Sequence, residues 1–267
     1  MKRIIRKIEK RPQTIRETVD SVSKTNGVTK RNVSKVTTKS NVPTVRVGKH
    51  VSTKGAKNEP NITYHQLSPM WINETVFIIG GGPSLSNFDF NALLGKKVIA
   101  INKAILSYPQ AQALYWTDSR FYGWYEQEVD SYKGLKYTIR PNYRYTENSE
   151  VNILRKGKKF GLEKAVDTLA HGNNSGYAAI NLAYHLGARR IILLGYDMGN
   201  NGTKSHFHEG YPTRQTSDKI YQDQFIPGFK QLAEELKAKN IEVLNASPYS
   251  RLTSFPKITL EKAMLYK

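Results

Sequence analysis

The sequence predicts an α/β protein with a mainly parallel sheet and helices on both of its faces, preceded by a basic, disordered N-terminal arm. Short apolar runs alternate with segments whose apolar residues recur at helical spacing. That alternation is typical of buried parallel strands connected by helices. The distribution of charge along the 267 residues separates the arm from the rest of the chain.

Six short apolar runs are expected to be strands, because continuous apolar character over four to six residues indicates a buried strand. In chain order they are residues 76–80, 98–102, 113–117, 136–139, 190–195 and 241–245. Two polar segments, 141–172 and 199–220, are expected to be long loops. In this architecture such loops often form lids or bind substrate.

Two helices are predicted between the later strands from apolar residues at i, i+3, i+4 and i+7. The first carries this pattern and then a glycine stop at Ala179, Leu182, Ala183, Leu186 and Gly187. The second repeats the pattern before the last strand at Phe229, Leu232, Ala233 and Leu236. An aromatic cluster is expected to serve the core rather than to stack on a ligand: Tyr115, Trp116, Phe121, Tyr122, Trp124 and Tyr125.

The chain carries 41 Lys and Arg against 22 Asp and Glu, a formal charge of +19. Residues 1–60 hold 16 of the basic and 4 of the acidic residues and none of the Phe, Trp or Tyr. Such a segment buries too little apolar surface to offset the roughly 1–2 kcal/mol per residue that ordering a backbone costs. We therefore expect an arm at 1–60 and a folded domain at 61–267. The arm is either a solubilising tail or a tether to nucleic acid or a virion assembly, with a membrane surface a weaker alternative.

Composition also excludes several classes of protein. There is no Cys, which rules out disulfides, thiolate catalysis and Cys-ligated metal sites. No apolar run approaches the ~20 residues of a membrane span, and the basic residues 1–6 are not followed by the apolar stretch of a signal peptide. A cytoplasmic location is the expectation.

Polar or glycine residues follow four of the predicted strands. They are Gly80 to Ser84, Asn102, Asp118 and Asp197. Ligands of parallel α/β sheets bind beyond the carboxyl ends of the strands, near a switch in strand order. The sequence therefore predicts a ligand site at these strand ends.

The first strand runs into Gly80, Gly81, Gly82, Pro83 and Ser84. Glycines allow a sharp turn and a close ligand, while the proline suits a first helical turn and the serine can cap it or donate to a phosphate. Leu85 replaces the third glycine of the dinucleotide fingerprint, and the chain has no P-loop. The turn favours a nucleotide or phosphate cradle, with a tight strand-to-helix turn as the alternative.

Three further groups have both a functional and a structural interpretation. Ser175 and Gly176 open the first predicted helix, where Ser175 would be the N-cap or would contact a ligand. Asp197 would contact ribose hydroxyls or orient a catalytic group, or would cap a turn. His206 and His208 would act as acid, base or phosphate contacts, hold a metal with Glu209, or lie in a plain surface loop.

These motifs together resemble one superfamily. The glycine turn with Leu85, Asn102, Ser175–Gly176 and the strand-end run 191–197 are similar to bacterial sialyltransferases acting on lipooligosaccharide. They also resemble an uncharacterised-domain family that includes archaeal 6-hydroxymethylpterin diphosphokinases, Maf-type flagellin glycosylation proteins and phage-encoded proteins, the phage members most of all. The resemblance covers roughly residues 74–256.

The resemblance implies a Rossmann-like fold with a nucleotide at the glycine turn, Asn102 and Ser175–Gly176. It also implies a loop histidine as general base, a role that would fall to His206 or His208. The sialyltransferases place two tyrosines shortly after the strand-end aspartate, where this chain has residues 199–201, Gly-Asn-Asn. Sialyl transfer from a CMP donor is therefore less supported than nucleotide binding.

Three functions remain open at this point. The first is a glycosyltransferase-like transferase using a nucleotide or nucleotide-sugar donor and no firmly bound metal. In it Gly80 to Ser84, Asn102, Asp118, Ser175 and Gly176 would bind the nucleotide, and His206, His208 and Asp197 would be catalytic. The second is an ATP-dependent diphosphokinase of a small heterocycle, which would need Mg²⁺ bridged by substrate phosphates. The third is a phage accessory or assembly protein, in the host cytoplasm or virion, that binds nucleic acid through residues 1–60 and retains a nucleotide pocket.

Overall fold

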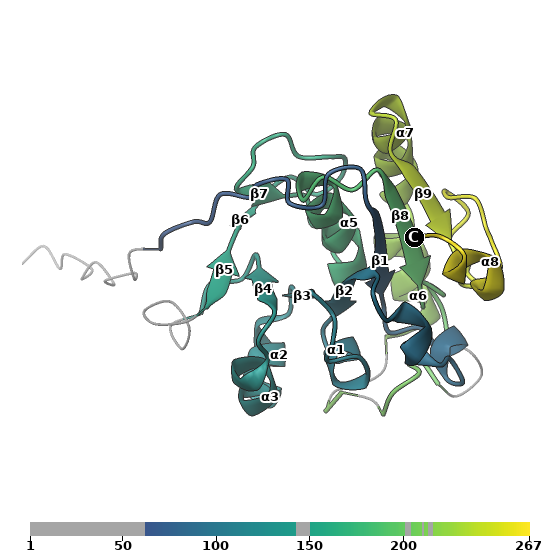
Figure 1. Cartoon of the computed structure of the whole chain (residues 1–267), viewed down its shortest axis with the longest axis horizontal. Helices are drawn as coiled ribbons and strands as arrows, with labels where there is room; N and C mark the ends of the chain where they lie inside the picture. The colour runs from purple at the N-terminus through teal and green to yellow at the C-terminus, as the bar shows by residue number, and fades with distance from the viewer. Residues whose placement is uncertain (1–61, 143–149, 201–203, 210, 213–215) are drawn as a thin grey trace, which may run out of the picture. The chain divides into compact units, whose positions relative to one another are not determined.

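The structure is a computed structural model that describes residues 62–142, 150–200, 204–209, 211–212 and 216–267. The predicted basic arm at 1–60 lies outside the described residues and stays a prediction. The described part is built on one seven-stranded sheet in the order β5-β4-β3-β2-β1-β8-β9 (Figure 1). Every neighbouring pair in this sheet is parallel. The predicted fold class is confirmed.

The strands of the sheet are β1 (Thr75–Ile79), β2 (Lys97–Ile101), β3 (Ala113–Trp116), β4 (Leu135–Thr138), β5 (Val151–Ile153), β8 (Arg190–Leu194) and β9 (Glu242–Asn245). A second, two-stranded parallel sheet pairs β6 (Arg155–Lys156) with β7 (Thr168–Leu169). The α-helices are α1 (Ala104–Ser107), α2 (Ser119–Trp124), α3 (Glu126–Ser131), α5 (Ser175–His185), α6 (Asp218–Ile220), α7 (Phe229–Ala238) and α8 (Leu260–Met264). Two 3-10 turns, η1 (Pro83–Leu85) and η2 (Phe90–Leu93), and one π-helical turn, η3 (Tyr221–Phe225), complete the set.

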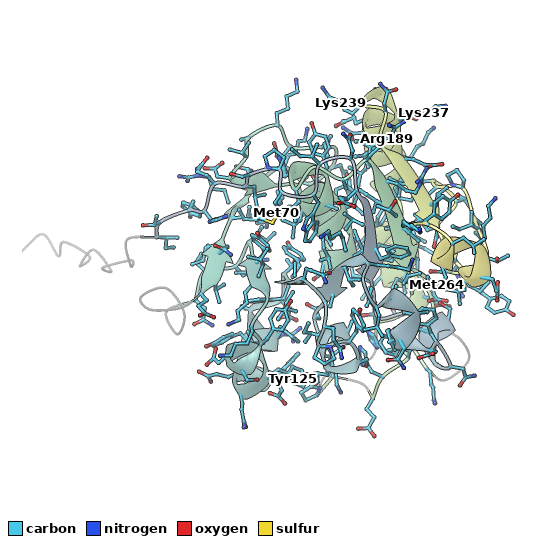
Figure 2. The ribbon with its side chains drawn as sticks, in the orientation of Figure 1. Met70, Tyr125, Arg189, Lys237, Lys239 and Met264 are labelled. Atoms are coloured by element: carbon cyan, nitrogen blue, oxygen red, sulfur yellow. The ribbon has the colours of Figure 1, made fainter. Side chains whose placement is uncertain are left out.

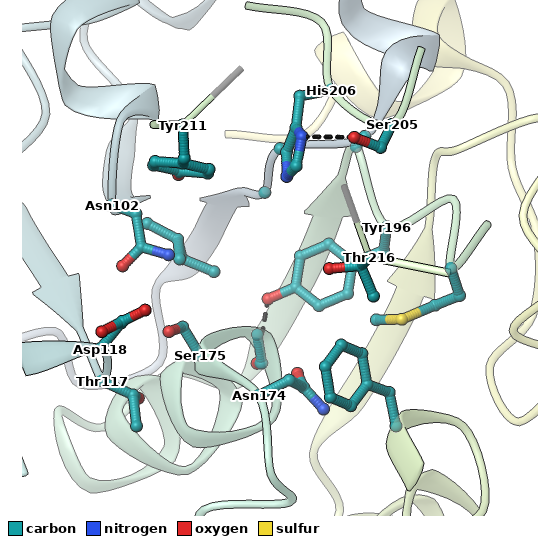
Figure 3. Close-up of a pocket in the computed structure, with 18 of the residues that line it drawn as sticks. Asn102, Thr117, Asp118, Asn174, Ser175, Tyr196, Ser205, His206, Tyr211 and Thr216 are labelled. Carbon is teal, nitrogen blue, oxygen red and sulfur yellow. Dashed lines mark hydrogen bonds between the residues drawn. The ribbon is translucent and has the colours of Figure 1, made fainter. Parts of the chain in front are cut away.

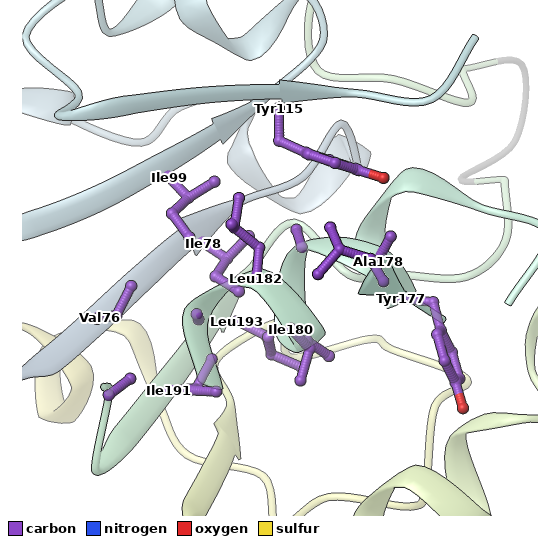
Figure 4. Packing of buried hydrophobic residues seen from close by; sticks show 14 of the residues in the cluster. Val76, Ile78, Ile99, Tyr115, Tyr177, Ala178, Ile180, Leu182, Ile191 and Leu193 are labelled. Carbon is purple, nitrogen blue, oxygen red and sulfur yellow. The ribbon is translucent and has the colours of Figure 1, made fainter. Parts of the chain in front are cut away.

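Successive residues of the strands point to opposite faces, and both faces are covered. Val76 and Ile78 of β1 pack with α5 and α7 in one core, which Figure 4 shows around Leu182. Phe77 and Ile79 pack in a second core with residues of α1, α2, α3 and α8. Burial on both faces explains why these strands are continuously apolar rather than alternating.

The six predicted strands and both predicted helices are present, and their ends differ from the predicted ends by no more than four residues. The predicted loop at 141–172 contains β5, β6 and β7, so that expectation was wrong for these short segments. Of the aromatic cluster, Tyr115, Trp116, Phe121 and Tyr122 are buried, and Trp124 and Tyr125 are half-buried. The prediction that this cluster serves the core is confirmed for the four buried rings.

The order of the strands creates a switch point beside β1. The chain builds outward from β1 through β2, β3 and β4 to β5, and then returns to place β8 on the other side of β1. The carboxyl ends of β1 and β8 therefore flank a crevice, which is where ligands bind in such sheets. Figure 2 shows Tyr125, beyond the end of β3, at the opposite end of the domain from Arg189, at the start of β8.

None of the helices in the described ranges has both the length and the apolar character that a membrane span requires.

Candidate nucleotide-binding site

The carboxyl ends of β1, β2, β3 and β8 surround a pocket of about 830 Å³ (Figure 3). Eight of the twelve residues predicted from sequence line it: Gly80, Gly81, Gly82, Asn102, Asp118, Ser175, Gly176 and His206. The other four, Pro83, Ser84, Asp197 and His208, do not line it. We call this the main pocket. The structure brings the predicted strand ends together as expected from the topology.

The glycine turn packs against the turn that follows β8. The N–H groups of Gly80 and Gly82 donate to the carbonyls of Leu194 and Gly195, both at 2.8 Å. A Cβ on Gly82 would overlap the carboxylate of Asp197. These glycines thus bring two strand ends together, and two of the turn's N–H groups are already bonded to protein.

Asp197 lies behind the glycine turn instead of in the main pocket. Its Oδ2 accepts a 2.8 Å hydrogen bond from the Ser84 hydroxyl, and its side chain is buried. Burial raises the pKa of this carboxyl, and the bonds from Ser84 partly offset the increase. The sequence predicts that Asp197 contacts the ligand, and that role stays a prediction. Its position behind the glycine turn does not favour contact with a ligand of the main pocket.

Asn102 follows β2 with a backbone φ of +51°, which asparagine tolerates better than most residues. Its side chain lies in the pocket near Tyr211, whose hydroxyl accepts a 3.3 Å bond from the Lys103 N–H (Figure 3). Its Oδ1 is buried and has no hydrogen-bond partner among the described residues. Leaving a buried acceptor unpaired costs about 1–3 kcal/mol, so an atom of this kind in a pocket indicates a missing donor.

The N-terminus of α5 opens into the same pocket through Asn173, Asn174, Ser175 and Gly176. Asn174 caps the helix by accepting a 2.8 Å bond from the Tyr177 N–H, so the prediction of Ser175 as N-cap was off by one residue. Ser175 is instead the first helical residue. The first N–H groups of a helix and its dipole favour an anion at this end.

The loop at residues 204–209 is held over the glycine turn, where Phe207 N–H donates to Gly81 O at 3.0 Å. His206 reaches the pocket, and its Nδ1 shares a 2.8 Å hydrogen bond with the buried Ser205 hydroxyl (Figure 3). Burial, His208 and Lys103 together lower the pKa of His206 to about 4. The imidazole is therefore neutral at pH 7 and able to accept a proton.

His208 stacks on His206, with ring centroids 5.0 Å apart, and does not reach the pocket. Its Nδ1 lies 2.7 Å from the carbonyl of Glu209 and must carry the proton, since a carbonyl can only accept. Burial also lowers the pKa of His208. Its position suits support of His206 better than direct contact with a ligand of the main pocket.

Asp118 caps α2 and forms an ion pair with Arg120 at 2.6 Å, and both side chains line the pocket. Desolvation by burial works against ionisation of Asp118, but the bonds from Arg120 outweigh it and leave the pKa lowered. The pair presents guanidinium and carboxylate edges to a ligand.

Sequence reasoning did not single out several other lining residues. Tyr196, Tyr211, Thr216, Tyr221 and Phe225 all reach the pocket. The last two come from the π-helical turn η3, a local structure that often occurs at functional sites. Their signal in the sequence is weak, because they come from a segment whose spacing follows no regular period.

Among the described residues, no three His, Asp or Glu side chains are grouped so that they could hold a metal ion.

The comparisons with known proteins identify the fold. No protein-family model matches the chain, and no curated protein matches it in sequence. The structure of the Maf glycosyltransferase from Magnetospirillum magneticum AMB-1 matches 74% of this chain with a TM-score of 0.52 and 15% identity. The match covers 35% of that protein, so this chain spans about a third of its length.

The sialyltransferase CstII from Campylobacter jejuni, in complex with cytidine-5'-monophosphate, matches 73% of this chain and 88% of its own. Its TM-score is 0.44 and its identity to this chain is 17%. The likeness to the Maf glycosyltransferase confirms the part of the predicted resemblance that concerns the fold. A relation to diphosphokinases or to phage-encoded proteins stays a prediction.

Proposed function

We propose that this protein is a glycosyltransferase-like transferase that uses a nucleotide-activated donor bound in the main pocket. The observation that carries the proposal is the buried, unpartnered Oδ1 of Asn102, a residue that lines the same pocket as the N-terminus of α5. The first group requires a hydrogen-bond donor, such as a ribose hydroxyl or a base amino group. The second favours an anion, such as a phosphate. A nucleotide carries both.

The phosphates of the donor would lie at the N–H groups of Ser175 and Gly176. This assignment differs from a phosphate cradle made by the glycine turn, because Gly80 and Gly82 already donate to Leu194 and Gly195. Arg120, whose guanidinium is paired with Asp118, would donate its remaining N–H groups to the phosphates. The glycine turn would then let the nucleotide approach the backbone closely. It would not bind the phosphates through all of its N–H groups.

His206 would act as the general base. An acceptor hydroxyl would attack the anomeric carbon of the donor, the bond from that carbon to the phosphate oxygen would break, and the nucleotide would leave with the electron pair. His206 would take the hydroxyl proton, with Ser205 fixing its ring through Nδ1. Tyr211 and Tyr221, which line the pocket after Asp197 in the chain, offer hydroxyl donors to the departing phosphate.

The decisive experiment is a calorimetric titration of the full chain with CMP, UDP, CMP-sialic acid, UDP-sugars and ATP, the last with and without Mg²⁺. Binding of a pyrimidine nucleotide or its sugar without a metal requirement is the expected result. Binding of ATP alone, only with Mg²⁺, would favour a diphosphokinase instead. If none of these ligands binds, the proposal is wrong.

Asn102→Gly is the variant that tests the assignment, because glycine accepts the positive φ while the amide is lost. Asn73→Gly is its matched control, since Asn73 also has a positive φ, +62°, but does not line the main pocket. We expect about a tenfold or greater loss of nucleotide affinity for Asn102→Gly, which corresponds to roughly 1.4 kcal/mol. Asn73→Gly should bind as the unchanged protein does.

A further inference from the structure

A second pocket, of about 470 Å³, lies behind the glycine turn. We call it the side pocket, and it is lined by Pro83, Asp197, Gly199, Asn200, Tyr249 and Arg251. Gly199 lines both pockets, so a ligand of the side pocket would lie next to a ligand of the main pocket. Pro83 and Asp197, which the main pocket does not use, belong here.

Asn200, which lines the side pocket, has a buried acceptor atom with no donor among the described residues. The N–H of Asn200 donates to Asp218 Oδ1 and its Nδ2 donates to the carbonyl of Thr216, each at 3.1 Å. These bonds fix the carboxamide and leave Oδ1 buried, without a partner among the described residues. With Asp197, whose side chain is 7% exposed, it gives the pocket two groups that accept hydrogen bonds.

The charges of the side pocket do not favour an anionic ligand. Arg251 is the basic residue of the lining, and its guanidinium is already paired with Asp218 at 2.9 Å. It lies flat against Gly199, where a Cβ would come within 2.8 Å of Arg251 Nε. A phosphate would therefore face the Asp197 carboxylate without a free counter-charge from the described residues of the lining, whereas hydroxyl groups can donate to both acceptors.

The rim of the side pocket is aromatic. The side chain of Tyr249 is 82% exposed, although a large ring usually buries much of its surface. Exposed rings beside polar groups are suited to ligands that have both an apolar face and polar edges. A sugar ring combines C–H faces with equatorial hydroxyls, and so matches the ring of Tyr249 and the hydrogen-bond acceptors of the same pocket.

We infer that the side pocket binds a neutral sugar unit of the acceptor, with its hydroxyls on Asp197 and Asn200 and its ring on Tyr249. The inference rests on the proposed transferase function, because it is the donor in the main pocket that makes this sugar an acceptor. Contact through Gly199 is what would bring the two substrates together. In this arrangement Asp197 binds the acceptor sugar behind the glycine turn and does not bind the nucleotide.

The test uses saturation-transfer NMR on the full chain with a panel of methyl glycosides of neutral hexoses and N-acetylhexosamines, with and without the nucleotide found by titration. At least one glycoside should bind. Tyr249→Ala should weaken that binding about tenfold or more, and Tyr249→Phe, which keeps the ring, should retain it. Leu265→Ala, at a residue that is 81% exposed and lines neither pocket, is the control for loss of exposed apolar surface.

The outcomes separate this inference from the proposed function. Nucleotide affinity should be unchanged in Tyr249→Ala, while Asn102→Gly should lose nucleotide and keep glycoside binding in the absence of nucleotide. If nucleotide binds but no glycoside does, or if Tyr249→Ala leaves glycoside affinity unchanged, the side pocket is not the acceptor site and the main-pocket proposal stands. If glycoside binding depends on Tyr249 but no nucleotide binds, the side pocket is a sugar site and the transferase proposal is wrong.

Discussion

The carboxylate of Asp197 occupies the space that a side chain on Gly82 would need. A Cβ at Gly82 would overlap Asp197 Oδ2 and come within 2.5 Å of the carbonyl oxygen of Gly195. The last glycine of the turn is therefore required by the packing of β1 against β8. A loss of nucleotide binding on enlarging Gly82 would report on this packing as much as on contact with a ligand.

Gly82→Ala should lower the free energy of unfolding by about 1–3 kcal/mol, the range for overpacking a filled site. Urea unfolding followed by circular dichroism measures this change. In an Asp197→Ala background the same substitution should cost less, because one of the two overlaps has been removed. If Gly82→Ala lowers the free energy of unfolding equally in both backgrounds, its overlap with Asp197 Oδ2 is not a cause of the loss.

Gly81→Ala should act on the site and hardly on stability. A Cβ there would lie 2.8 Å from Cδ2 of His206, and that ring belongs to a half-buried loop that can shift. We expect a change in the free energy of unfolding within about 0.5 kcal/mol. In NMR spectra of the imidazole groups, His206 should shift while His65, which packs on Tyr137, should not. Unshifted His206 resonances would mean that the glycine turn does not position this ring.

Much of the fold could be predicted because its strands are buried on both faces. Val76 to Ile79 and Ile191 to Leu194 are continuous apolar runs, and the helices of the domain cover both sides of the sheet they form. The strands β6 and β7 escaped prediction for the opposite reason. Each has two residues, and β6 is the exposed pair Arg155 and Lys156, so neither shows an apolar run.

The candidate site was predicted where it depends on strand ends and missed where it depends on packing between distant segments. Asn102 and Gly81 follow strands, and topology alone brings such residues together. The orientation of Asp197 depends on Ser84, 113 positions earlier in the chain, and no pattern in the sequence records that hydrogen bond. Tyr221 reaches the pocket from a π-helical turn, which has no apolar period of its own.

The capping of α5 gives a prediction that separates two adjacent residues. Asn174→Ala should lower the free energy of unfolding by about 1 kcal/mol, because the N–H of Tyr177 loses its acceptor. Ser175→Ala, one position later, should cost less than about 0.5 kcal/mol, since alanine is the best residue inside a helix. Urea unfolding of both variants measures the difference. If Ser175→Ala lowers the free energy of unfolding more than Asn174→Ala does, Ser175 is the N-cap, as the sequence predicted.

The buried His206 should make the protein less stable as the pH falls below neutrality. Its pKa is about 4 in the folded chain against 6.5 for an ordinary histidine, so between these values the unfolded chain binds a proton that the folded chain does not. The resulting loss of folding stability is negligible well above pH 6.5 and grows as the pH falls towards 4. Because the ring is half-buried and partly screened by solvent, we expect its share of the loss between pH 7 and pH 5 to be about 1 kcal/mol.

His206→Gln isolates this contribution from the other histidines whose pKa values are also lowered, among them His185 and His208. The variant should lose less stability than the unchanged protein when urea midpoints at pH 7 and pH 5 are compared. His65→Gln is the comparison at a histidine outside both pockets; burial lowers the pKa of His65 less far, so this variant should change the pH dependence less than His206→Gln does. If His206→Gln shows the same pH dependence as the unchanged protein, His206 takes up its proton near pH 6.5 in the folded chain. A base of that kind would be largely neutral at pH 7 but would lose its function below about pH 6, whereas a pKa near 4 keeps it a proton acceptor down to about pH 5.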